Sequence, residues 1–431
     1  MIVSVILGEN WQPLELGVLA QRGYKSLFPA SSPWTPHVTS LAFATTPPAR
    51  RRFLGRIAEL VDRAVQNVIF FSFYYIPVSL ALLNPLLRRS DVRQVHVGSS
   101  RFDSGRYAIY VLWQPTGAIP WYVRTLLEEL REHQVNTIAV VNHDPSPEQL
   151  SILQSLCAQV LVRGNKGSDF GAYKDAVLDL TRDNKSVSRL LLLNDSAYVF
   201  PRGLTKLVAE LLSDDHPVVS AYECWERLYH FQSFCIGLSG TLLYDRRVQD
   251  FWERYRPIAI RKWRIDHGEV ALSAALRDVS PNFKVIYGLN DLLDVLTAGD
   301  DWAAILKYRE FVPRPLRHLF PPDEVLVVLQ QAEPGERELL LRRLREGLSD
   351  LLMLRAQAHT GAFFFPKFLG SPFLKRDLVY RELFSLYEVE RLLGELGFGE
   401  YREPIADDIR RRGTGAHLKG ITRRRYRLGL I

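Results

Sequence analysis

A short, uninterrupted apolar run at Leu190–Leu193 narrows most strongly what this chain can fold into. Turn-forming residues bound the run and no helix cap precedes it, so we interpret it as a buried parallel strand. Asn194, Asp195 and Ser196 follow directly. Because open α/β sheets bind ligands at the carboxyl ends of their strands, these small polar and acidic side chains predict a binding site there.

The same alternation of strands and helices continues on both sides of this run. Before it, a loop with Asn165, Gly167 and Gly171 leads into an amphipathic helix that ends near Leu180. Other apolar strands are expected at 107–113, 137–141, 160–163, 218–222 and 234–238, with helices at 121–133, 147–158 and 269–277. This spacing predicts an α/β fold with a mostly parallel sheet flanked by helices. We expect an N-terminal extension at 1–106, an α/β core at 107–300, and a mostly helical C-terminal region with a basic tail at 301–431.

Five short motifs occur along the chain in a fixed order. They are Gly-Ser-Asp-Phe-Gly-Ala-Tyr-Lys-Asp at 167–175, Leu-Leu-Leu-Asn-Asp-Ser at 191–196, His-Phe-Gln-Ser at 230–233, Gly-Glu-Val-Ala-Leu-Ser at 268–273 and Pro-Phe-Leu-Lys-Arg-Asp-Leu at 372–378. Together they resemble the rhamnan synthesis protein F family of bacterial glycosyltransferases, which build surface polysaccharides. The family's usual Asn/Ser/Thr/His cluster is replaced here by Gln-Ala-His-Thr-Gly at 357–361.

The resemblance implies a GT-A-like fold and a nucleoside diphosphate sugar as donor. The sugar is expected to be L-rhamnose or another deoxyhexose, and the acceptor a growing lipid-linked glycan or oligosaccharide. The predicted enzyme is an inverting glycosyltransferase. The alternative is a non-catalytic scaffold component of a polysaccharide assembly complex, in which Asn194-Asp195-Ser196 is a degenerate relic.

Several donor-binding residues are predicted ahead of the central strand. Asp144 follows the strand at 137–141, where GT-A transferases place an acid that accepts a hydrogen bond from the base or the ribose. The alternative is a helix-capping arrangement of Asp144 with Ser146. Asn165 and Gly167 would let the backbone approach the nucleotide closely.

Two charged residues lie nearest the expected diphosphate. Lys174 either binds phosphate as a point charge or is an exposed helix lysine. Asp169 either contacts the donor or caps the helix. Asn194, Asp195 and Ser196 complete the predicted donor-binding set.

Asp195 is also the predicted metal ligand. Related GT-A enzymes carry an Asp-x-Asp motif at this strand end, and two carboxylates there chelate Mg²⁺ or Mn²⁺. Here the flanking Asn194 and Ser196 are neutral, so both a metal-dependent and a metal-independent site stay open. Without a metal, cationic side chains must stabilise the leaving phosphate. By sequence position the candidates are His230, Arg246 and Arg247.

Glu269 is the predicted general base. Its motif resembles the acid-x-x-Leu element of inverting GT-A enzymes, so its carboxylate would take the acceptor proton. The alternative is a first-turn glutamate favoured by the helix dipole, and Asp266 and His267 are the substitutes nearest in sequence. Sugar or acceptor contacts are assigned to His230, Gln232 and Ser233.

The net charge limits which partners we expect, and the cysteine content indicates where in the cell the protein is expected. Lysine and arginine number 55 against 48 acidic residues, a formal net charge of +7, which suits phosphorylated donors and anionic lipid. Nucleic acid is not expected, because the basic runs lack interleaved aromatic residues and a reading motif. The three widely spaced cysteines and the absence of a basic leader indicate a cytoplasmic protein without a signal peptide.

An uncharged apolar segment at Val68–Leu87 is long enough to cross a bilayer. Arginines on both sides disfavour a single span. We therefore expect a helix that is bent at Pro77 and returns to the same leaflet, or one that lies in the interface; a buried helix pair is the alternative. With the arginine-rich tail near anionic lipid, the protein would be peripheral at the cytoplasmic face of the inner membrane.

Overall fold

The structure is a computed structural model that describes residues 49–182, 186–226, 228–298, 307–320, 329 and 331–431. The first 48 residues of the predicted N-terminal extension therefore lie outside the described residues. The three cysteines, Cys157, Cys224 and Cys235, are buried.

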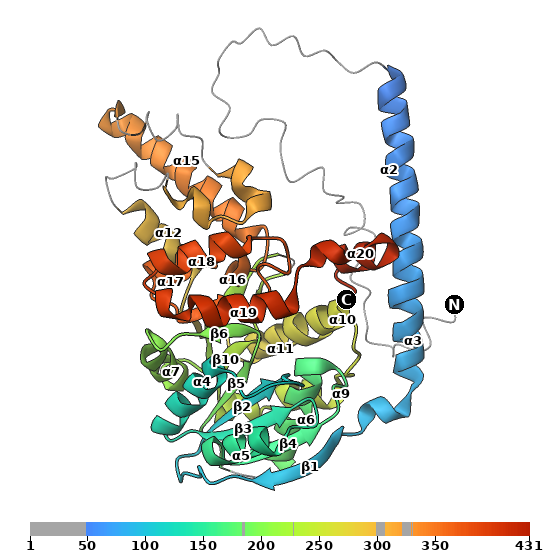
Figure 1. Cartoon of the computed structure of the whole chain (residues 1–431), viewed down its shortest axis with the longest axis vertical. Coiled ribbons are helices and arrows are strands. Elements are labelled where there is room, and N and C mark those ends of the chain that lie inside the picture. Colours follow the sequence, from blue (N-terminus) through green and yellow to red (C-terminus); the bar gives the residue numbers. More distant parts are fainter. Residues whose placement is uncertain (1–48, 183–185, 227, 299–306, 321–328, 330) are drawn as a thin grey trace.

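An eight-stranded sheet forms the centre of the molecule, in the order β1-β4-β3-β2-β5-β10-β7-β11 (Figure 1). Its strands are β1 (Val92–Val97), β2 (Arg106–Leu112), β3 (Asn136–Val141), β4 (Gln159–Arg163), β5 (Arg189–Asn194), β7 (Val218–Ser220), β10 (Cys235–Ser239) and β11 (Phe283–Val285). β2, β3, β4 and β5 run parallel, as do β7 and β11, whereas β1 and β10 are antiparallel to their neighbours. The predicted α/β class with a mostly parallel sheet flanked by helices is confirmed.

Helices cover both faces of the sheet because successive strand residues point to opposite sides. One face, with Tyr110, Leu191 and Leu193, packs under α4 (Trp121–Glu132), α5 (Pro147–Leu156), α7 (Leu204–Leu212) and α12 (Leu289–Thr297). The other face, with Ile109, Leu190 and Leu192, packs under α6 (Ser168–Arg182), α9 (Arg246–Arg254) and α11 (Ala271–Val279). Leu190–Leu193 is fully buried, as the uninterrupted apolar run predicts.

Most of the C-terminal region packs on the first of these faces, whereas Leu428 and Leu430 at its end join the hydrophobic cluster of the other face. Its elements are α15 (Pro334–Met353), α16 (Gln357–Thr360), α17 (Phe364–Phe368), α18 (Leu386–Glu395), α19 (Arg402–Arg412) and α20 (Gly420–Arg427). Phe363, Leu374 and Leu393 share one hydrophobic cluster with the sheet residues Tyr110 and Leu193. The strand β12 (Phe373–Lys375) pairs antiparallel with β6 (Ala197–Val199), which follows β5 almost directly. The C-terminal region thereby reaches the edge of the sheet where β5 ends.

The remaining elements are short. They are β8 (Glu223–Cys224) paired with β9 (His230–Phe231), the α-helices α8 (Gly240–Leu243) and α10 (Arg261–Trp263), a π-helix at Arg264–Val270, and 3₁₀ turns at Pro85–Arg88, Tyr308–Phe311, Arg314–Leu319, Gly399–Tyr401 and Gly415–His417.

A long helix lies along one side of the molecule (Figure 1). It consists of α2 (Ala49–Phe70), a π-helical turn at Phe71–Tyr75 and α3 (Ile76–Leu83). The predicted return of the chain at Pro77 is wrong, because the chain stays helical through Pro77 to Leu83, with the π turn directly before the proline. Within it, the segment Glu59–Leu83 is long and apolar enough to cross a membrane, by length and composition alone. In an apolar stretch of 18 residues of this segment, 17% of the stretch is buried.

Candidate active site

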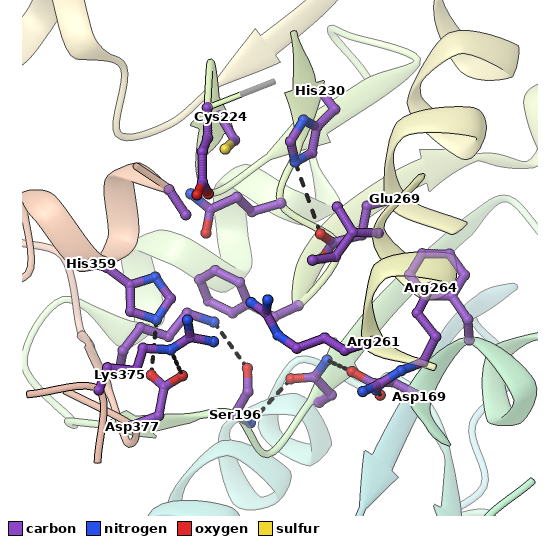
Figure 2. Close-up of a pocket in the computed structure, with 18 residues that line it drawn as sticks. Asp169, Ser196, Cys224, His230, Arg261, Arg264, Glu269, His359, Lys375 and Asp377 are labelled. Atoms are coloured by element: carbon purple, nitrogen blue, oxygen red, sulfur yellow. Dashed lines mark hydrogen bonds and ion pairs between the residues drawn. The ribbon is translucent and has the colours of Figure 1, made fainter. Parts of the chain in front are cut away.

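A cavity of about 220 Å³ opens at the carboxyl end of β5, the edge at which open α/β sheets bind ligands. Four parts of the chain meet there (Figure 2). They are the first turn of α6 with Asp169, the tip of β5 with Asn194 and Ser196, the β9 and π-helix region with His230, Gln232 and Glu269, and the C-terminal region with His359, Lys375 and Asp377. The cavity thus brings together six of the residues predicted from the sequence.

The tip of β5 presents neutral side chains to the cavity. Asn194 Nδ2 donates to Asp169 Oδ2 at 3.2 Å, and Asn194 Oδ1 accepts from the backbone N–H of Ser196 at 3.1 Å. On its other oxygen, Asp169 pairs with Arg264 Nη1 at 2.9 Å. These contacts hold the start of α6 against the strand tip, and they join two residues of the predicted donor-binding set to Asp169.

Asp195 faces away from the cavity, into the core. Its Oδ2 accepts from the backbone N–H of Trp113 and from Arg376 Nη1, both at 3.2 Å. Arg376 also pairs with Asp408 of α19 at 3.3 Å, so a buried arginine joins two carboxylates. Burial raises the pKa of Asp195 to about 6, although Arg376 opposes the shift.

The donor atoms at this strand tip do not fit a chelated divalent cation. The carboxylate of Asp195 is occupied by Arg376 outside the cavity lining, that of Asp169 by Arg264, and the two side chains that do face the cavity at the tip are neutral. Within the residues that the structure describes, no group of three or more His, Cys, Asp or Glu side chains is placed to hold a metal ion. Hard cations prefer several carboxylate oxygens, which this tip does not offer.

Glu269, the predicted base, lines the cavity from the π-helical segment Arg264–Val270. Ser233 Oγ donates to Glu269 Oε1 at 2.5 Å, and His230 Nε2 lies 3.9 Å from Oε2 (Figure 2). Isolated π-helical segments are rare and occur frequently at functional sites. One carboxylate oxygen is therefore fixed by a buried serine, and the other faces a buried histidine.

His230 and Gln232 are buried and held by backbone groups. His230 Nδ1 lies 2.7 Å from the carbonyl oxygen of Leu228. A carbonyl can only accept, so Nδ1 carries the proton and Nε2 faces Glu269. Gln232 Nε2 donates to the carbonyl oxygen of Glu223 at 3.0 Å. These contacts fix two of the three predicted sugar or acceptor contacts at the wall of the cavity, and the third, Ser233, bonds to Glu269 instead.

Lys375 was not among the predicted site residues, although it belongs to the fifth sequence motif. It is nearly buried, and its Nζ donates to Ser196 Oγ at 3.0 Å and lies 3.4 Å from the ring centre of Phe234. Burial lowers the pKa of Lys375 to about 8, opposed by the charges of Asp377 and Glu269. Its ammonium therefore lies at the neutral tip of β5.

Arg261 of α10 extends into the middle of the cavity (Figure 2). Among the described residues, no carboxylate lies within ion-pair distance of its guanidinium. Burial lowers the pKa of Arg261 to about 10, so it stays charged at neutral pH. No local spacing in the sequence marks this arginine, because only the fold brings it to the strand tip.

His359 and Asp377 form a third group that sequence reasoning left without a role. His359 Nε2 lies 2.9 Å from Asp377 Oδ1, and Arg381 pairs with the other oxygen of Asp377. These two partners hold the pKa of Asp377 well below its usual range against the effect of burial, and burial lowers the pKa of His359. His359 comes from the stretch 357–361, which departs from the pattern of the resembled family.

Besides Asp195 and Lys174, three predicted donor contacts do not line the cavity. Asp144 is 84% exposed and lies 3.6 Å from Arg93, while Ser146 is the residue that caps α5. Asn165 is exposed. Gly167 has φ +72°, and a Cβ there would lie 2.3 Å from Pro257 Cβ, so a proline packs where the nucleotide backbone contact was predicted.

Three predicted cations also lie away from the cavity lining. Lys174 is buried in α6, and its Nζ donates to the carbonyl oxygens of Glu253 and Tyr255 at 3.1 and 2.6 Å. Arg246 pairs with Asp250 at 2.8 Å on the outer face of α9. Arg247 pairs with Asp245. Lys174 is therefore not an exposed helix lysine either, since it ties α6 to the end of α9.

Comparisons with known proteins give a distant similarity. No protein-family model matches this chain. The uncharacterized protein y4gN of Sinorhizobium fredii (strain NBRC 101917 / NGR234) is 22% identical over 194 residues, 44% of this chain and 50% of that protein. The chain thus spans about half the length of this curated relative.

Two solved structures are similar over most of their own length. A candidate nucleotide-diphospho-sugar transferase from Desulfovibrio desulfuricans G20 has a TM-score of 0.23 and 11% identity, covering 56% of this chain and 98% of that one. The mannosyltransferase PcManGT from Pyrobaculum calidifontis, solved with GDP-Man and Mn²⁺, has a TM-score of 0.27 and 9% identity, covering 80% and 97%. At these scores no substrate, metal or family is carried over, and the rhamnan synthesis assignment stays a prediction.

Proposed function

We propose that this chain is a GT-A-like, inverting glycosyltransferase that uses a nucleoside diphosphate sugar. The observation that carries the proposal is the position of Glu269, whose carboxylate is held by Ser233 at 2.5 Å in the same cavity as the tip of β5. A nucleoside diphosphate at the strand tip would leave its sugar between the tip and Glu269.

The proposed reaction uses this placement of Glu269. Glu269 takes the proton of an acceptor hydroxyl, and the hydroxyl oxygen forms a bond to the anomeric carbon. The bond from that carbon to the diphosphate oxygen breaks, and its electron pair leaves with the nucleoside diphosphate. His230, whose Nε2 lies 3.9 Å from Oε2, and Gln232 contribute polar contacts to the sugar or the acceptor.

The sugar and the acceptor are proposed from the sequence motifs. The resemblance to the rhamnan synthesis protein F family supports an activated L-rhamnose or another deoxyhexose as donor. It also supports a growing surface polysaccharide, lipid-linked or as oligosaccharide, as acceptor. We place the protein at the cytoplasmic face of the inner membrane, where the exposed apolar residues of the helix at Glu59–Leu83 and the arginines of α20 would contact anionic lipid.

The test is a donor screen with the full-length protein. dTDP-, UDP- and GDP-sugars are supplied one at a time, and nucleoside diphosphate release is measured with and without oligosaccharide acceptor. We expect release with one nucleotide class, accelerated by the acceptor. If no nucleoside diphosphate or its sugar binds, with or without Mg²⁺ or Mn²⁺, the enzyme proposal is wrong and the scaffold alternative is favoured.

A further inference from the structure

We propose that Lys375 and Arg261 bind the leaving diphosphate in place of a divalent cation. The proposal rests on the proposed function and concerns the same cavity. The residues at the tip of β5 do not fit a bound metal. The two side chains that face the cavity there, Asn194 and Ser196, cannot chelate a divalent cation as a pair of carboxylates would.

Lys375 lies where the charge of a metal would be needed. The pairing of β12 with β6 sets Lys375 opposite Ala197, and its Nζ donates to Ser196 Oγ at 3.0 Å. An ammonium group has three donors, so two stay available to phosphate oxygens after this bond. The centre of the Phe234 ring lies 3.4 Å from Nζ, so the ring face covers another side of the ammonium.

Arg261 supplies the second charge. Arg264 and Arg381 also line the cavity, but they are paired with Asp169 and Asp377. In the described part of the chain, the Arg261 guanidinium pairs with no carboxylate, and its planar fork suits two oxygens of one phosphate. A bound diphosphate would therefore give this guanidinium a direct anionic partner, in addition to the more distant charges of Asp377, Glu269 and Glu226.

The charge balance of the reaction favours this arrangement. As the bond between the sugar and the diphosphate breaks, one further negative charge develops on the departing phosphate oxygen. Two fixed cations that line the cavity can stabilise that charge without reorganising, as a bound metal would. Lys375 can donate to the oxygen directly, because its ammonium already lies at the strand tip.

The first test measures nucleoside diphosphate binding to the wild-type protein by calorimetry, in EDTA and then in Mg²⁺ or Mn²⁺. We expect the same Kd, within about twofold, in all three conditions. Binding that appears only with a divalent cation, or that tightens more than tenfold, overturns the inference but leaves the proposed function standing. No binding in any condition overturns both.

The second test removes the charges one at a time. Lys375→Met and Arg261→Met should each weaken nucleoside diphosphate binding by at least about tenfold and weaken nucleoside binding much less, a difference that a general structural defect would not produce. Lys367→Met, in the exposed turn of α17, is the matched control and should bind as wild type. If Lys375→Met does not fold, as judged by its thermal transition, Arg261→Met decides. Wild-type affinity in a folded variant overturns the assignment for that residue.

Discussion

Lys375 Nζ donates a hydrogen bond to Ser196 Oγ at 3.0 Å, across 179 residues of sequence. The bond joins the C-terminal region to the tip of a strand in the central sheet. The candidate site is therefore complete only when both parts of the chain are present.

The affinity for a nucleoside diphosphate should fall as the pH rises from 7 to 9. The pKa of Lys375 is lowered to about 8 by burial, while Asp377, Glu269 and Asp169 favour its charged form and Arg381 opposes it. The protonated form binds the anion, so the affinity is full below pH 8 and is lost above it, by about tenfold at pH 9 relative to pH 7. Calorimetry across this range measures it.

Lys375→Arg is the control for this pH dependence, because an arginine keeps its charge at pH 9. Its affinity should be nearly constant over the same range. A flat profile in the wild-type protein would contradict the assignment.

Glu269→Gln should abolish transfer without abolishing donor binding. The amide keeps the shape of the side chain and can still contact Ser233, but it cannot take a proton. Loss of a general base lowers the rate by about 10²–10⁴-fold. Initial rates with saturating donor, together with the Kd for the nucleoside diphosphate, separate the two effects.

The matched variant is Glu253→Gln, on the half-exposed part of α9. It should transfer sugar at the wild-type rate. Normal turnover by Glu269→Gln would remove the base assignment.

Arg376→Met should destabilise the fold strongly. Arg376 is buried between Asp195 and Asp408, so its loss leaves the Asp195 carboxylate without its cation, whereas Asp408 keeps its pair with Arg412 at 2.9 Å. Removing one partner of a buried ion pair costs about 3–5 kcal/mol in the free energy of unfolding. Denaturant unfolding measures the loss, and Arg254→Met on the exposed face of α9 should change the stability by less than about 0.5 kcal/mol.

The loss in the free energy of unfolding that Arg376→Met causes should become smaller as the pH falls from 7 to 5. Burial already raises the pKa of Asp195 to about 6 in the intact protein, so the folded state favours its protonated form. A carboxyl whose pKa is higher in the folded than in the unfolded state loses stability as the pH rises through that range. Equal deficits at pH 5 and pH 7 would contradict this account.

Gly167→Ala should destabilise the start of α6. The glycine has φ +72°, and an added Cβ would lie 2.3 Å from Pro257 Cβ. Overpacking of this kind costs about 1–3 kcal/mol, and it should also weaken donor binding by displacing Asp169. Thermal unfolding compares it with Gly335→Ala in α15, where no atom lies within 4 Å and stability should hold or rise.

Anionic vesicles should bind the protein through the long helix. Leu80 and Leu83 are exposed at 64% and 66%, so replacing both with glutamate should abolish co-flotation with phosphatidylglycerol vesicles. The comparison is Leu339→Glu, an exposed leucine of α15, which should float as wild type. Equal flotation of all three proteins would contradict membrane contact through this helix.

The strands of the central sheet could be predicted because burial leaves a local pattern. Leu190–Leu193 carries no polar residue since both of its faces are covered by helices. The long helix was also predictable from its apolar length, but its course past Pro77 was not, because a π turn leaves no simple mark in sequence.

The site was predictable only in part, for two physical reasons. Side chains alternate along an extended strand end, so Asn194 and Ser196 face the cavity while the charged residue between them, Asp195, faces the core. The carboxylate of Asp195 was predicted as a ligand because of its chemistry. In the structure it lies on the side of the chain that faces away from the cavity. Lys375 and Arg261 reach the site through long-range packing, which no local spacing encodes.

The pairing of β12 with β6 has a consequence for anyone recombining this chain with its relatives. A cassette cut at the apparent end of the sheet, near residue 300, would carry the strand tip and the carboxylate of Glu269 but leave the lysine behind. In chimaeras built to exchange sugar preference, residues 356–381 and the α/β core should therefore come from the same parent protein.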